Sequence, residues 1–216
     1  MPALSNTSDC QPPLDPGQQA LITPNRNDGV NRGQGSNFEA LVQACRGGLE
    51  AEICCLVVNN PGCGAQQKAE RHGIASVVLN HRDYASREDL DRALIETFRS
   101  QGVEVVVMAG WMRIVTPLLI DAFQNRLINI HPSILPSFRG MDAVGQALRA
   151  GVSITGCTAH LVTEEVDAGA VICQAAVPVL AGDDTTSLSS RIHAQEHTMY
   201  PWAVALLGQQ LRNGQG

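Results

Sequence analysis

The segment Arg126-Leu127-Ile128-Asn129-Ile130-His131-Pro132-Ser133 combines an apolar run with two polar side chains that stand just before a proline. The apolar residues predict a β-strand, and Pro132 ends it because proline cannot continue the hydrogen-bonding ladder. Side chains alternate between the two faces of a strand, so Asn129 and His131 share one face. A carboxamide and an imidazole side by side can donate hydrogen bonds to an oxygen that gains negative charge, and the imidazole can also move a proton. The segment therefore predicts a strand with a candidate catalytic pair at its carboxyl end.

A third candidate group lies farther along the chain. An Asn and a His at a strand end often only cap backbone groups, so the pair alone does not establish catalysis. Gly156 to Val162 predicts another strand, and the acidic turn Thr163 to Gly169 that follows could hold the carboxylate of Asp167 over the end of the first strand. The two glutamates of this turn would raise the pKa of Asp167, whereas a protonated His131 would lower it. The sequence alone does not decide which of these two effects on the pKa of Asp167 is larger.

The remaining apolar segments indicate an α/β fold. Continuous apolar runs at 51–58 and 103–108 predict strands buried on both faces, as in a parallel sheet, and residues 170–179 predict a strand that turns back antiparallel. We expect a doubly wound, mostly parallel sheet with a C-terminal antiparallel strand and a long helix, and ligands at the carboxyl ends of the strands. A further short strand is expected at 76–79, and helices from residue 36 and at 64–72, 86–99, about 142–150 and 184–211, the last kinked or broken at Pro201.

Four separated motifs carry a resemblance to a known family. These are N-I-H-P-S-x-L-P at 129–136, H-x-V-x-x-x-x-D-x-G at 160–169, M-A-G-W-M-R-I at 108–114 and Q-E-H-x-x-Y-P at 195–201. Taken in their order along the chain, these motifs resemble the folate-dependent formyltransferases, and the resemblance runs from about Gly35 to Leu206. The resemblance implies a Rossmann-like formyltransferase domain over residues 35–212. It also implies an enzyme of purine biosynthesis that transfers a formyl group from 10-formyltetrahydrofolate, as co-substrate, to the amine of glycinamide ribonucleotide (GAR), without a metal.

The same resemblance assigns roles to individual residues. Small residues before a helix expose backbone N–H groups to an anion, which suits a phosphate at Gly33-Gln34-Gly35-Ser36-Asn37, with Ser36 as a plausible N-cap. A loop of apolar and main-chain groups after the strand 103–108 suits a flat heterocycle. The implied catalytic residues are Asn129, His131 and Asp167, with His160 in support. The implied GAR contacts are Gly35, Ser36, Asn37, Arg87 and Glu196, and the implied folate contacts are Met112, Arg113, Ile114, Val115 and Asn129.

The N-terminal segment departs from the family pattern. Residues 1–34 are rich in Asn, Pro, Gly, Gln and Ser, and their compact apolar group is Ala20-Leu21-Ile22. We expect this segment to be largely disordered or degraded, because the family runs an apolar strand directly into the glycine loop and residues 27–32 form a poor strand. An inactive or weakly active folate-binding relative is therefore one alternative, and a formyltetrahydrofolate hydrolase is another. Val144, Ala159 and Leu161 also depart from the residues more common in the family.

Composition limits the kinds of molecule that we expect the protein to bind. The chain has 216 residues, 44% of them hydrophobic, and a net charge of −6 without a run of cations, which argues against nucleic-acid binding. It has neither an apolar run of bilayer length nor a signal pattern, so we expect a cytoplasmic monomer or homodimer with small-molecule substrates and no membrane partner. Seven cysteines without a C-x-x-C pair favour reduced thiols. His193 and His197 have a metal-pair spacing but no evident third ligand.

Overall fold

The computed structural model describes residues 20–24, 34–111 and 113–214 of the chain. Within these residues the strands form one seven-stranded sheet in the order β3-β2-β1-β4-β5-β6-β7. The first five strands are parallel, β6 runs antiparallel to β5, and β7 runs antiparallel to β6. The predicted doubly wound, mostly parallel sheet is thus confirmed, and its reversal begins at β6. The strands are β1 Ala20–Pro24, β2 Leu56–Val58, β3 Ser76–Val78, β4 Val105–Ala109, β5 Leu127–His131, β6 Ile154–Leu161 and β7 Val171–Pro178.

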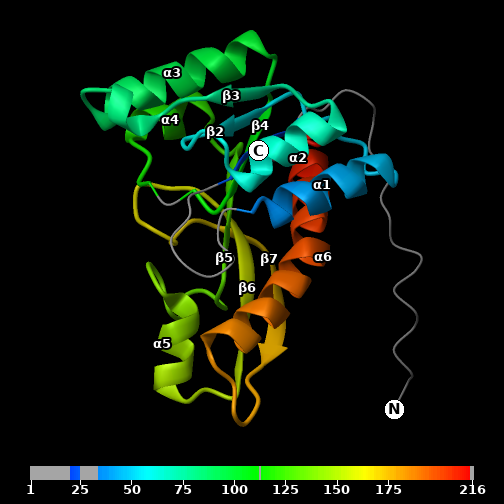
Figure 1. The fold of residues 1–216 in the computed structure, drawn as a ribbon, viewed down its shortest axis with the longest axis vertical. Helices are drawn as coiled ribbons and strands as arrows, with labels where there is room; N and C mark the ends of the chain where they lie inside the picture. Colours follow the sequence, from blue (N-terminus) through cyan, green and yellow to red (C-terminus); the bar gives the residue numbers. More distant parts are fainter. Residues whose placement is uncertain (1–19, 25–33, 112, 215–216) are drawn as a thin grey trace.

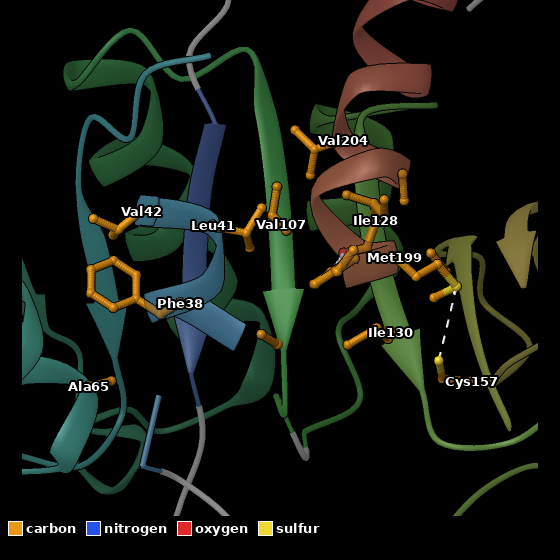
Figure 2. Packing of buried hydrophobic residues seen from close by; sticks show 14 of the residues in the cluster. Phe38, Leu41, Val42, Ala65, Val107, Ile128, Ile130, Cys157, Met199 and Val204 are labelled. Carbon is orange, nitrogen blue, oxygen red and sulfur yellow. Dashed lines mark hydrogen bonds between the residues drawn. The ribbon is translucent and has the colours of Figure 1, made fainter. Parts of the chain in front are cut away.

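Helices cover both faces of the sheet (Figure 1). The helices α1, α2, α5 and α6 contribute to one apolar cluster, and Figure 2 shows Leu41 of α1 beside Val107 of β4 in it. A second cluster joins α3 and α4 to the opposite face. Within the described residues, every helix is too short or too polar to serve as a membrane span. The helices are α1 Ser36–Arg46, α2 Gly64–His72, α3 Arg87–Ser100, α4 Pro117–Ala122, α5 Ala143–Ala150 and α6 Thr185–Arg212, with a 3-10 turn at His81–Asp83.

The N-terminal strand, which was expected to be degraded, is present as β1. Ala20–Pro24 pairs in parallel with β2 on one side and with β4 on the other, with Ile22 opposite both Leu56 and Val107. The expected loss of the first strand is therefore wrong, because the strand lies farther from Gly35 than the family pattern suggests. Residues 1–19 and 25–33, for which disorder was expected, lie outside the described residues, and the domain boundary at residue 35 stays a prediction.

Two other expectations need correction. The strand expected at 51–58 is limited to Leu56–Val58, because the strands on either side of it pair only with this part: Ile22 of β1 pairs with Leu56, and β3 begins opposite Leu56 at Ser76. The helix α6 continues through Pro201, so the break that was expected there as the alternative to a kink does not occur. The residues on both sides of the proline, Tyr200 and Ala203, are fully buried against the sheet, so tertiary packing holds the helix together.

The six cysteines within the described residues carry thiols and not disulfides. Cys55 and Cys157 are buried, and the thiol of Cys157 lies 4.0 Å from the sulfur of Met199, which reaches it from α6 (Figure 2). Burial raises the pKa of the Cys157 thiol to about 12, so this sulfur remains protonated and packs as an apolar group.

Candidate active site

A cavity of about 430 Å³ opens at the carboxyl ends of the parallel strands. Its walls come from three segments that follow strands in the sheet: the start of α1, the loop after β4 and the end of β5. The cavity lies where the strand order reverses, since β1 has β2 on one side and β4 on the other. Ligands bind at this position in open α/β sheets. The segment 140–144, the loop after β6 and one face of α6 complete the lining.

The three predicted catalytic side chains meet in this cavity. Nδ1 of His131 lies 3.2 Å from a carboxylate oxygen of Asp167, and both side chains are almost fully buried. The other ring nitrogen, Nε2, donates to the backbone oxygen of Phe138 at 2.8 Å. Both partners are acceptors, so the doubly protonated imidazolium is the form that satisfies both contacts. The turn after β6 therefore brings Asp167 to His131 at the end of β5, and the catalytic roles of the two residues stay predictions.

Asp167 is held as an anion. Burial raises its pKa, but hydrogen bonds from His160 and from the backbone N–H of Gly140, together with the charge of His131, lower it further, so the pKa of this carboxyl lies below its usual value. The Gly140 contact measures 2.9 Å. The glutamates of the turn have little influence, because both are exposed and Glu165 pairs with Arg139. The question that the sequence left open is thereby answered in favour of the lowered pKa.

His160 connects Asn129 to this ion pair. Its Nδ1 donates to the backbone oxygen of Leu161 at 2.8 Å. Its Nε2 lies 3.4 Å from the amide nitrogen of Asn129 and 3.6 Å from a carboxylate oxygen of Asp167. Nε2 accepts an N–H of Asn129 when the ring is protonated at Nδ1 alone, and it donates to Asp167 when the ring is doubly protonated. In both states an N–H of the Asn129 amide remains for a ligand, and Asn129 lines the cavity.

The glycine loop forms a second part of the cavity wall. Gly35 has φ 68° and is the N-cap of α1, so Ser36 is the first helical residue and not the expected cap. Gly35 lies against Ala65 of α2, where an added Cβ would come within 2.6 Å of the alanine Cβ. No side chain within the described residues caps this helix, which leaves its first N–H groups directed at the cavity.

Glu196 of α6 faces the start of α1. It accepts a hydrogen bond from the side-chain amide of Asn37 at 2.8 Å, and it is 4% exposed. Burial raises the pKa of Glu196 to about 7, although the bond from Asn37 offsets part of this effect. The other side-chain atom of Asn37, Oδ1, is buried and has no hydrogen-bond partner within the described residues. Buried polar atoms of this kind are normally satisfied, so Asn37 has capacity for a ligand.

The loop after β4 forms the third wall. Arg113, Ile114 and Val115 line the cavity, and the side chain of Ile114 is 58% exposed. The Nε atom of Arg113 is buried and has no hydrogen-bond partner within the described residues. Met112, which was expected in the same wall, lies outside the described residues.

Other expected residues have different positions. Arg87 begins α3, is exposed and does not line the cavity, so its expected contact with GAR stays a prediction. Val144 is buried in the cavity wall, and His193 lines it one turn before Glu196. The sequence reading missed two backbone groups, the oxygen of Phe138 and the N–H of Gly140. The only available signal was the short distance in sequence between His131 and these residues, and sequence patterns do not reveal which main-chain atoms return to a site.

A model of the Formyl transferase family matches residues 30–204 of the chain. The chain belongs to the formyl transferase family. This formyl transferase is 39% identical to the phosphoribosylglycinamide formyltransferase of Bacillus subtilis over 176 residues, which cover 81% of this chain and 90% of the relative. A solved structure, the glycinamide ribonucleotide transformylase 1 of Symbiobacterium toebii, shares its fold with a TM-score of 0.84 and 38% identity, over 89% of this chain and 88% of that chain.

Longer relatives contain the same region as one part. The formyl transferase is 43% identical over 178 residues to the trifunctional purine biosynthetic protein adenosine-3 of Drosophila melanogaster. The match covers 81% of this chain but only 13% of that relative.

Proposed function

We propose that this formyl transferase moves the formyl group of 10-formyltetrahydrofolate to the amine of glycinamide ribonucleotide. The observation that carries the proposal is the cluster of Asn129, His131 and Asp167 beside an uncapped helix start in one cavity. The relatives named phosphoribosylglycinamide formyltransferase support the choice of acceptor. Small-molecule substrates agree with the size of the cavity, whereas cellular location and oligomeric state stay predictions.

The acceptor would bind at the α1 side of the cavity. Its phosphate suits the N–H groups of Ser36 and Asn37, where the helix dipole is positive. Glu196 lies one hydrogen bond away from this point through Asn37, so it can hold other polar groups of the same substrate. The expected contacts of Gly35, Ser36, Asn37 and Glu196 are consistent with one another, because these residues share one wall.

The folate would bind on the β4 side. A pterin ring needs flat apolar walls with a few hydrogen-bonding groups. The segment Arg113 to Val115 offers both, through exposed Ile114 and through the backbone of the loop. Between the two walls, the formyl carbon would lie near Asn129 and His131, which line the same cavity.

The chemistry requires stabilisation of the formyl oxygen while the amine adds to the formyl carbon. Asn129 donates its second amide N–H, and the His131 imidazolium supplies positive charge and an N–H that is bound to Phe138 in this structure. We propose that the formyl oxygen replaces Phe138 as the acceptor of that N–H. Asp167, kept ionised by its lowered pKa, holds the imidazolium and accepts the amine proton directly or through a water. Collapse of the tetrahedral intermediate then breaks the bond between the formyl carbon and N10, and the proton passes to N10, which leaves as part of tetrahydrofolate.

Formyl transfer by the purified protein tests this proposal. Loss of 10-formyltetrahydrofolate should require GAR, and kcat should fall by roughly 10²–10³ in Asn129→Ala, which removes one donor to the oxyanion. Asp167→Asn should also lower kcat strongly, since it removes the charge that holds His131. The exposed Glu70→Gln serves as a control and should leave kcat unchanged. Consumption of the folate without GAR would point to a hydrolase, and a folded wild-type protein without turnover would contradict the proposed activity.

A further inference from the structure

A carboxylate outside the cavity supports the loop that lines its β4 side. Asp91 stands in the middle of α3 and is 3% exposed, although aspartate is rarely buried without a specific partner. It does not line the cavity. Its neighbours on α3, Leu90 and Leu94, belong to the apolar cluster between α3, α4 and the sheet.

The partner of Asp91 is the residue that ends the loop. An oxygen of Asp91 accepts a hydrogen bond from the backbone N–H of Thr116 at 2.6 Å, and both groups are buried. Thr116 is the N-cap of α4 and directly follows the cavity-lining segment Arg113 to Val115. A buried N–H without a partner is costly, so this contact fixes where the loop ends.

Within the part of this loop that the structure describes, burial anchors the two ends and not the middle. At its start, Trp111 is buried in the α3–α4 cluster. At its end, Val115 is also buried there, whereas Ile114 between them is 58% exposed. The position of the exposed segment therefore depends on its two ends, and Asp91 provides the hydrogen bond at the second of them.

We infer that Asp91 is a positioning residue that sets the affinity of the cavity for folate by holding the loop Arg113 to Val115 through the backbone of Thr116. This inference rests on the proposed function, since it assigns the β4 side of the cavity to folate. It predicts a selective effect: weaker folate binding, with binding of the acceptor at α1 and the chemical step at Asn129 and His131 left intact.

The test compares Asp91→Ala with Asp91→Asn in the full-length protein. The alanine removes the acceptor, whereas the asparagine keeps an oxygen that can accept from Thr116. We expect the Kd for tetrahydrofolate, measured by calorimetry, to rise about tenfold in Asp91→Ala, because even a modest loss of binding free energy changes Kd by this factor. Asp91→Asn should restore affinity close to that of the wild type. The KM for GAR and kcat at saturating folate should stay near wild-type values in both variants.

Two further measurements separate positioning from general stability. Hydrogen exchange of the amides from Arg113 to Thr116 should speed up in Asp91→Ala, while amides of β4 and β5 stay protected. The matched control is Glu96→Ala, which removes an exposed carboxylate from the same helix and should change neither the exchange nor the Kd. If Asp91→Ala does not fold, Asp91→Leu keeps the branching at Cγ without an acceptor and should show the same selective loss.

The outcomes are distinct. An unchanged Kd in a folded variant without the acceptor would overturn the inference, as would equal losses for folate and GAR together with a lower kcat. A wild-type protein that does not bind tetrahydrofolate would overturn the folate assignment and thus the proposed function. In that case the exchange of the Thr116 amide would still decide whether Asp91 holds the loop.

Discussion

Glu196 is a buried carboxyl group whose protonation is coupled to folding. Its side chain is 4% exposed, and its principal partner is the amide of Asn37. A neutral amide only partly replaces the water that an ionised carboxylate loses, so the pKa of Glu196 rises from 4.5 to about 7. Near neutral pH, both protonation states of Glu196 are therefore present before a ligand binds.

This coupling predicts how stability depends on pH. Between pH 4.5 and about 7 the folded protein binds more protons at Glu196 than the unfolded chain, so the contribution of Glu196 to stability falls as pH rises through this window. One pKa unit corresponds to about 1.4 kcal/mol, which gives a loss of up to about 3 kcal/mol. Denaturant unfolding at a series of pH values should show that Glu196→Gln lacks this loss.

The control is Glu96→Gln, an exposed glutamate on α3. The stability of the Glu96→Gln variant should equal that of the wild type at every pH. Parallel curves for wild type and Glu196→Gln would show that Glu196 is not coupled to folding in this way.

At the same scale, the sequence predicted which side chains come together in the cavity but not their environment. Alternation along the strand placed Asn129 and His131 together, and the acidic turn placed Asp167 opposite them. The backbone oxygen of Phe138 and the N–H of Gly140 could not be predicted, since each depends on the path of a loop. These two groups are part of what fixes the imidazolium and lowers the pKa of Asp167.

The start of α1 shows how two elements together form a binding surface. The helix begins at Gly35, which has a left-handed conformation and lies against Ala65 of α2. The amine of Lys68, one turn farther along α2, donates to the backbone oxygen of Gly35 at 3.3 Å. Contacts with α2 therefore help to hold the glycine loop in place, in addition to its connection to α1.

A pair of glycine substitutions separates strain from close packing. Gly35 and Gly73 have nearly the same backbone conformation, with φ 68° and 70°, but only Gly35 has a neighbour within 4 Å of an added Cβ. Gly73→Ala should cost about 1 kcal/mol of stability, because left-handed conformations disfavour side chains. Gly35→Ala should cost about 1–3 kcal/mol more and should also raise the KM for GAR, since the clash with Ala65 displaces the loop.

Thermal unfolding of both variants and initial-rate kinetics provide the measurement. Equal losses of stability in the two variants would show that the loop accommodates the added methyl group without a clash against Ala65. A raised KM for folate in Gly35→Ala, with the KM for GAR unchanged, would contradict the placement of GAR at α1.

For the molecule as a whole, β1 joins the two halves of the sheet. It is the only strand within the described residues that links β2 and β3 to β4 and the strands beyond it. Parallel neighbours on both sides leave its backbone groups no alternative partner inside the protein. An enzyme with this sequence therefore requires a strand from the N-terminal segment.

Substitution of a proline in this strand tests that requirement. Ile22→Pro removes a backbone donor between two neighbouring strands, and each buried group left unpaired costs about 1–3 kcal/mol. We expect a large loss of stability or failure to fold, measured by circular dichroism and urea unfolding. Ile22→Val keeps the backbone donor and should fold normally. Wild-type stability in Ile22→Pro would show that Ala20–Pro24 is not a central strand.

The sequence by itself determined the order and type of most elements, because hydrophobic period and proline position act locally. It also predicted the three side chains proposed as catalytic, since strand alternation and motif spacing preserve their geometry. Only the tertiary structure decided that Ala20–Pro24 is an interior strand, that β2 is short and that α6 continues through Pro201. Each of these depends on neighbours distant in sequence: paired strands satisfy the backbone of β1, and buried packing outweighs the helix-breaking preference of proline.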